Sequence, residues 1–239
     1  MPLPTIVTPT YELELPSTGK KIKYRPFLVK EEKLLVLALE TENTKDISTA
    51  IKSVLKNCIQ SRGVKVDNLP TFDIEYLFLN IRGKSVGEEI EVNLISPDDE
   101  VTQVPVTINV DDIKVQKSED HNKKVKLDDT LVMEMKYPSL DQFIKSNFDF
   151  GDEVTMDQSF DLIASCIDKI YNEEEVWSTA DCTKKEVKEF LEQMNSLQFK
   201  EIEKFYETKP KLSHNVTFTN PKTEVESTVV LEGLSSFFA

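Results

Sequence analysis

The densest apolar stretch of the chain covers residues 69–88, and its spacing changes at one point. Between Phe72 and Arg82, apolar side chains fall on nearly every side of a helix. A helix of this kind is buried on several sides, in a core or at a partner's surface. Thr71 is a candidate cap for its start, and Gly83 is expected to end it in a left-handed conformation. The residues after Lys84 alternate as in a strand.

Alternating apolar and polar residues elsewhere predict three hairpins and one further strand. The hairpins cover residues 11–24, 88–110 and 216–231, and the strand covers residues 131–136. Helical spacing predicts further helices. Their expected ranges are 30–39 with Leu34, Leu35 and Ala38 inward, 46–60, 140–144, 156–170, 184–194 after a capping box of Thr183 and Glu186, and 196–209. The charged segment 116–126 reads as an exposed loop.

The predicted order is hairpin, helices, hairpin, strand, helices, hairpin. Such segregated runs indicate an α+β fold and argue against a doubly wound sheet. With 239 residues, the chain can hold one large domain or two small ones. We expect an N-terminal α+β domain at residues 1–138. Residues 139–239 are then a mainly helical domain with a C-terminal hairpin.

The formal net charge is −14. Residues 1–110 carry 13 basic and 16 acidic side chains, and the rest of the chain carries 16 and 27. A surface this acidic repels phosphate backbones, so we expect no binding to nucleic acid. It can serve solubility alone, or it can steer a basic partner. The longest apolar run, Leu34–Leu39, is far shorter than the roughly 20 residues of a membrane helix, so no membrane association is expected.

Residues that carry chemistry are scattered. Gly83-Lys84-Ser85 resembles the end of a phosphate-binding loop, but Phe78 stands where that motif needs its first glycine. His121 and His214 lie near no nucleophile or metal motif. The odd cysteine count, without a signal peptide, indicates reduced intracellular thiols. We therefore expect no catalytic residue, no cofactor, no metal site and no small-molecule substrate.

Three segments in order carry a family resemblance: residues 10–38 (TYELELPSTGKKIKYRPFLVKEEKLLVLA), residues 69–88 and residues 231–238 (LEGLSSFF). Together they resemble the baseplate hub and hub-assembly proteins of T-even-type contractile-tailed bacteriophages. The resemblance implies a late, structural or assembly protein of the baseplate hub. It would be assembled in the bacterial host cytoplasm, sit in the virion tail baseplate and bind other hub and tail proteins.

Some members of the family that this chain resembles carry a cysteine pair in the second hairpin that looks like a zinc ribbon. The turns here, Ile95–Asp99 and Thr219–Pro221, contain no cysteine. The zinc role therefore does not carry over, and we expect hairpin packing to replace it.

Other functions remain open from the sequence. One is a hub-associated hydrolase that degrades cell wall with an unrecognised active site. A weaker one is an acidic mimic of nucleic acid. The sequence also leaves open whether the protein stays in the virion or acts only during assembly.

Four side chains are candidates for partner binding. Leu234, Phe237 and Phe238 form an apolar C-terminus, which can fold back onto the chain or dock into a neighbouring subunit. Trp177 follows three acidic residues and is either buried under a loop or presented to a partner.

Overall fold

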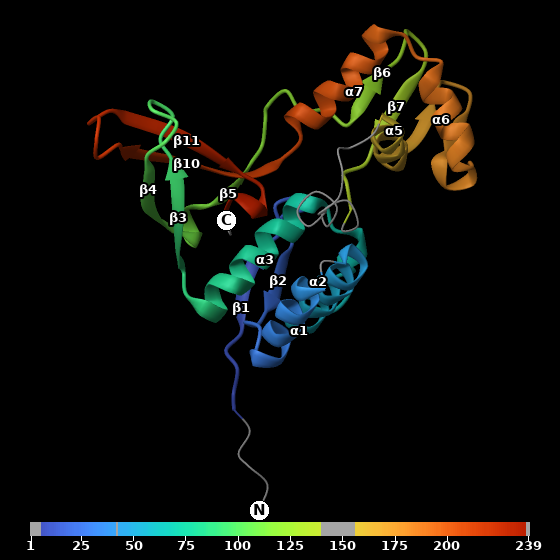
Figure 1. Ribbon diagram of the computed structural model, residues 1–239. Coiled ribbons are helices and arrows are strands. Elements are labelled where there is room, and N and C mark those ends of the chain that lie inside the picture. The colour runs from blue at the N-terminus through green and yellow to red at the C-terminus, as the bar shows by residue number, and fades with distance from the viewer. Residues whose placement is uncertain (1–5, 42, 140–155, 238–239) are drawn as a thin grey trace, which may run out of the picture.

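The computed structural model describes residues 6–41, 43–139 and 156–237, without the side chains of residues 44, 45, 48, 234 and 235 (Figure 1). It shows an α+β fold of helices and small antiparallel sheets, as the sequence predicts. The helices are α1 (Val29–Glu40), α2 (Thr44–Cys58), α3 (Thr71–Val86), α5 (Met156–Ser165), α6 (Lys184–Glu192) and α7 (Ser196–Thr208). The short helical turns are η1 (Val66–Asn68), η2 (Val110–Asp112), η3 (Thr179–Asp181) and η4 (Leu234–Phe237).

All three predicted hairpins form. They are β1 (Tyr11–Glu14) with β2 (Lys21–Tyr24), β3 (Glu89–Ile95) with β4 (Gln103–Asn109), and β10 (Lys211–Thr219) with β11 (Glu226–Glu232). β5 (Lys114–Gln116) adds a third strand beside β10. The remaining strands form one sheet in the order β6 (Lys124–Lys126), β7 (Val132–Met135), β8 (Ile167–Tyr171), β9 (Val176–Ser178). The charged segment 116–126 is thus an exposed loop only between β5 and β6.

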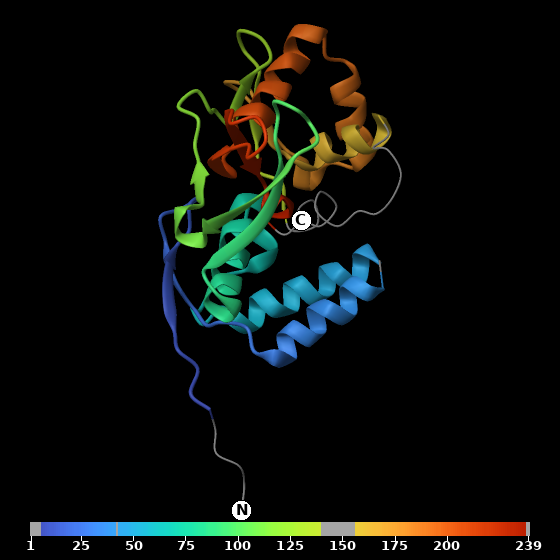
Figure 2. The ribbon, with the colours of Figure 1, turned by 60° about the vertical axis from the view of Figure 1, so that its left-hand side comes forward.

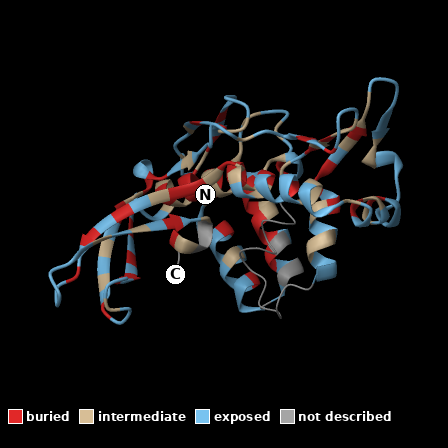
Figure 3. Cartoon of the chain, turned by 90° about the horizontal axis from the view of Figure 1, so that it is seen from above, coloured by how far each residue is buried: buried red, intermediate tan, exposed pale blue. Residues whose placement is uncertain are grey.

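Two hydrophobic cores hold these elements together. The first combines β1–β5, α1–α3 and the β10–β11 hairpin. The second lies between the sheet β6–β9 and the helices α5, α6 and α7, which form the upper right part of Figure 1. Seen from above, buried residues are interspersed with more exposed ones along the strands and helices (Figure 3). The two cores do not divide the chain at residue 138. β6 and β7 precede that residue but belong to the second core, whereas β10 and β11 follow it but belong to the first. The domain boundary at residues 138–139 stays a prediction.

α3 is the central helix of the first core, as its all-round apolar sequence predicts. Leu77, Leu79 and Ile81 are fully buried. Two details of the prediction are wrong. Pro70 precedes the helix, so Thr71 is its first residue and not its cap. Gly83 lies inside the helix, where an added Cβ would stand 3.2 Å from Val110 Cγ1. This glycine therefore serves a close approach between α3 and η2.

The chain leaves α3 at Gly87 instead, whose φ of 133° favours glycine. α1 and α2 are confirmed over nearly their predicted ranges, and they lie side by side (Figure 2). The helix expected at residues 140–144 lies outside the described residues. The capping box of Thr183 and Glu186 is present at the start of α6.

The predicted helix over residues 156–170 is wrong in its second part, because α5 ends at Ser165 and β8 follows. The pairing of β8 with β7 shifts between Glu134 and Met135, which skips Asp168. Such a bulge places two residues opposite one and changes which face the next side chains take. Ile167 and Ile170 are therefore both buried although they are three residues apart. A spacing of three residues between apolar side chains is also typical of a helix, which explains the wrong prediction.

Candidate partner-binding site

α1 is the most apolar exposed element of the first core. Its exposed fractions are 79% at Val29, 50% at Val36 and 49% at Leu37. Leu34 is also exposed, so its predicted inward position is wrong, whereas Ala38 is buried and Leu35 half-buried. Soluble proteins rarely expose several neighbouring large apolar side chains, and such patches mark interaction sites.

These exposed side chains of α1 (Val29, Leu34, Val36 and Leu37) are called the exposed stripe. It borders an apolar groove of about 290 Å³. α1, α2 and α3 each form one side of it. Charged groups in its lining come from Glu32 and Arg82, and burial lowers the pKa of Arg82. The apolar lining residues are Phe27, Leu35, Val36, Ala38, Leu39, Ile47, Ile51, Phe78 and Val86. A groove of this composition is suited to an apolar segment.

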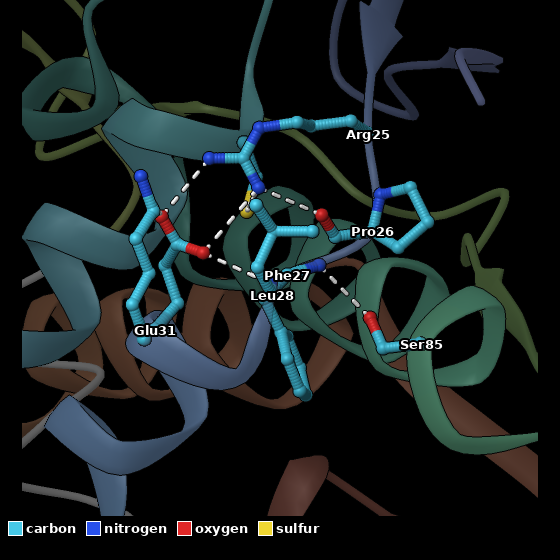
Figure 4. A network of polar contacts seen from close by, with 8 residues as sticks. Arg25, Pro26, Phe27, Leu28, Glu31 and Ser85 are labelled. Carbon is cyan, nitrogen blue, oxygen red and sulfur yellow. Dashed lines mark hydrogen bonds and ion pairs between the residues drawn. The ribbon is translucent and has the colours of Figure 1, made fainter. Parts of the chain in front are cut away.

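A polar network fixes the start of α1 (Figure 4). Arg25 Nη2 donates to Glu31 Oε1 over 2.9 Å, and Arg25 Nη1 donates to the Pro26 carbonyl oxygen over 2.8 Å. The Leu28 amide donates to Glu31 Oε2 over 2.9 Å. Glu31 is almost fully buried. Burial alone would raise the pKa of Glu31, but the hydrogen bonds from Arg25 and Leu28 outweigh it, and the pKa is lowered.

The same network reaches the far side of the groove. The Phe27 amide donates to Ser85 Oγ over 2.9 Å, and Ser85 Oγ donates to the Ile81 carbonyl oxygen of α3. Phe27 is itself part of the groove lining. These contacts therefore set the position of α1 relative to α3, and with it the width of the groove.

Among the sequence candidates at the C-terminus, Phe237 has a described side chain, and it lies on η4. Phe237 is fully buried in the first core, and the Gly233 amide donates to the Leu212 carbonyl oxygen over 2.9 Å. The ring of Phe237 thus packs inside its own chain, which is the fold-back alternative. The side chain of Leu234 and the whole of Phe238 lie outside the described residues. Docking of this segment into a neighbour stays a prediction.

Trp177 lies on β9, an edge strand of the sheet β6–β9. Its exposed fraction is 41%, and Val176 beside it is more exposed still. The structure does not bring Trp177 together with the C-terminal candidates, because they belong to different cores. Sequence reasoning also missed the α1 groove, whose only signal was the run of apolar residues at 34–39.

The turns of the second and last hairpins meet at one carboxylate. Asp98 accepts hydrogen bonds from Ser96 Oγ, from Asn220 Nδ2 over 3.0 Å and from Thr223 Oγ1. These hydrogen bonds, that of Ser96 first, hold the pKa of Asp98 below its usual value. Ser96 and Asn220 are fully buried.

The two turns also share one backbone form. Glu100 and Glu224 occupy matching positions with φ of 55° and 60°, and each donates its amide to the residue four positions earlier. A zinc ion in such a place needs thiolate or imidazole ligands. The residues of these turns do not fit zinc. They offer no thiolate or imidazole, and the Asp98 carboxylate already accepts hydrogen bonds from Ser96, Asn220 and Thr223. Polar contacts across the turns join the two hairpins, and apolar side chains of both hairpins also pack together in the first core.

Titratable side chains elsewhere in the described chain lie in separate surroundings. Within residues 6–41, 43–139 and 156–237, no three His, Cys, Asp or Glu side chains gather as metal ligands. His121 contacts Thr208 Oγ1 and the Tyr137 hydroxyl, each at 3.0 Å. Burial raises the pKa of Cys58 to about 11, so this thiol is protonated in the core. Among the described helices, none has the length and apolar character needed to cross a bilayer.

Comparison with known proteins gives one match. A family model described as "T4 bacteriophage base plate protein" matches residues 8–239. Neither a curated protein nor a solved structure matches the chain. The matched range includes both cores, the α1 groove and the joined hairpins. The chain belongs to the T4 bacteriophage base plate protein family.

Proposed function

We propose that this base plate protein is a component or assembly factor of the baseplate hub, and that it works by binding other tail proteins through the α1 groove. Its family implies a place in the virion tail and partners among tail and baseplate proteins. The observation that carries the proposal is the exposed apolar stripe of α1 beside an open apolar groove.

An apolar face of a helix in a neighbouring baseplate protein suits this groove best. Helix-in-groove recognition uses a few apolar side chains spaced along one face. The groove lining has one side from each of three helices, which leaves an elongated apolar surface with charge from Glu32 and Arg82. Burial of an exposed Val or Leu side chain contributes up to about 1.5–3 kcal/mol, so several exposed side chains of α1 can contribute to such a contact.

A charge placed in the stripe tests the proposal. Leu37→Glu puts a carboxylate on a half-exposed position, so it should leave the melting temperature nearly unchanged. It should also abolish co-purification with identified hub or tail proteins from infected cells. Val230→Glu, on β11, is the matched control because Val230 is similarly exposed outside the groove. Equal capture of hub proteins by both variants would count against the groove.

Two finer questions have separate tests. Presence of the protein in purified virions separates a resident subunit from an assembly factor that leaves. A hydrolase is the alternative function, and no specific observation favours it. Degradation of purified cell wall by the isolated protein would support that alternative, and we expect no such turnover.

A further inference from the structure

A second pocket lies between the sheet β6–β9 and α7, and it shares no lining residue with the α1 groove. It has a volume of about 530 Å³, within the range of roughly 300–1,000 Å³ typical of binding pockets. The strand β6 forms one side and the helix α7 the other. Its apolar floor is formed by Val125, Val132, Tyr171 and Phe205. The pocket can therefore accept a large apolar or aromatic side chain.

Three lysines surround this floor. Lys124 and Lys126 come from β6, and Lys204 comes from α7. Across the described part of the chain, none of the three ammonium groups forms an ion pair. Asp120 and Glu201 also line the pocket, so its balance is one positive charge. A basic pocket stands out on a chain whose net charge is −14.

The other edge strand of the same sheet follows an acidic turn, which begins directly after Tyr171 of the pocket. β9 is the other edge strand, and the turn before it carries Glu173, Glu174 and Glu175. All three are exposed, and among the described residues none of them forms an ion pair. Asn172 holds the turn, because its side chain accepts from the amides of Glu174 and Glu175. Trp177 follows on the strand with a half-exposed indole.

We infer that two copies of this chain associate head to tail, with Trp177 and the acidic turn of one copy entering the lysine-lined pocket of the next. The indole suits the apolar floor, and the three glutamates meet the three lysines. β6 and β9 are the two edge strands of this sheet, and the backbone groups of an edge strand can pair with another chain. This contact does not involve the α1 groove, so its test is independent of the test of the proposed function.

The geometry of the contact makes a specific demand. The two surfaces differ, so the interface is heterologous, and each copy keeps one free surface after pairing. Such contacts form rings when the rotation closes and chains when it does not. Self-association should therefore continue beyond a dimer as concentration rises. Because exposed ion pairs are screened by salt, the dissociation constant should rise roughly tenfold between low and high ionic strength.

Sedimentation velocity of the full chain tests the inference with two variants. The pocket variant is K124Q/K126Q/K204Q, and the edge variant is E173Q/E174Q/E175Q with W177S. Each variant alone should be monomeric. An equimolar mixture should form a dimer and nothing larger, because one intact pocket and one intact edge remain. Circular dichroism of each variant shows whether it is folded, and both should give the spectrum of the unaltered chain.

Two control variants carry the same charge changes elsewhere on exposed positions. These are K20Q/K21Q/K114Q and E89Q/E91Q/E226Q, and both should associate like the unaltered chain. The inference is overturned if the unaltered chain stays monomeric at its highest soluble concentration in low salt. It is also overturned if folded pocket and edge variants still self-associate, or if their mixture contains no dimer.

Discussion

Arg25 and Glu31 join the end of β2 to the first turn of α1 through an ion pair of 2.9 Å, with only 2% of the Glu31 side chain exposed. The pair shares its network with Ser85 and with Phe27, which lines the α1 groove. A buried carboxylate is stable only with such partners, because desolvation of a charge is costly. The surface proposed for binding thus rests on an interaction inside the core.

Replacement of Glu31 by Gln should lower the free energy of unfolding by about 3–5 kcal/mol, because it leaves the Arg25 guanidinium without its partner. Urea denaturation at neutral pH measures this. Glu12→Gln is the control, since Glu12 pairs with Lys23 over 3.7 Å on the surface and such pairs contribute about 0–1 kcal/mol. Equal stability of the two variants would show that the network does not hold α1.

The polar contacts between the two hairpin turns predict a second effect. Asn220→Ala removes a fully buried amide that donates to Asp98, and it should cost about 1–3 kcal/mol. Lys222→Ala in the same turn is exposed and should change little. Hydrogen exchange of the β3–β4 and β10–β11 amides should accelerate in the first variant only. If the β3–β4 amides keep their protection, the hairpins are joined by something other than Asp98.

His121 predicts a dependence of stability on pH. Burial, with Lys123 and Lys209 nearby, lowers the pKa of His121 from its usual value near 6.5. The folded protein therefore binds this proton less well than the unfolded chain, and stability falls as pH drops below about 6.5. The His121→Asn variant should lose less stability over that window. Denaturation at several pH values, with His214→Asn as control, measures the difference; identical slopes in all three proteins would contradict the prediction.

The C-terminus predicts a loss of stability on truncation. Removal of all residues after Gly233 deletes the fully buried ring of Phe237, which should cost about 3–5 kcal/mol. Phe237→Ala in the full-length chain should show most of the same loss, which assigns it to that ring. Thermal denaturation checks both proteins. A truncated protein that melts normally but fails to enter the baseplate would favour docking into a neighbour instead.

The sequence predicts the fold class and most elements because their apolar spacing is local. The buried faces of α2, α3 and α6 follow this spacing, and so do the hairpins. The errors arise where distant contacts decide. From the sequence, Gly83 is predicted to end a helix. In the structure it lies inside α3, and the close approach of Val110 accounts for a glycine there. The spacing of Ile167 and Ile170 resembles that of a helix because of a bulge that only pairing with β7 creates.

Candidate sites are less predictable for the same reason. Leu34 appears inward from α1 alone, and the placement of α2 and α3 turns it outward. For Phe237 the sequence leaves fold-back and docking both open, and only the structure shows that the first core buries its ring. The groove and the lysine-lined pocket each combine residues from separate elements, which no local pattern reveals.

Site-specific photo-cross-linking tests the central claim most directly. A photoreactive amino acid at Val36 stands in the exposed stripe of α1, and one at Thr228, on β11, serves as control. In infected cells, the Val36 probe should form a covalent adduct with an identified hub or tail protein, and the Thr228 probe should not. Absence of any tail or baseplate protein from the Val36 adducts, in cells that assemble functional tails, would contradict the proposal that the α1 groove binds a partner.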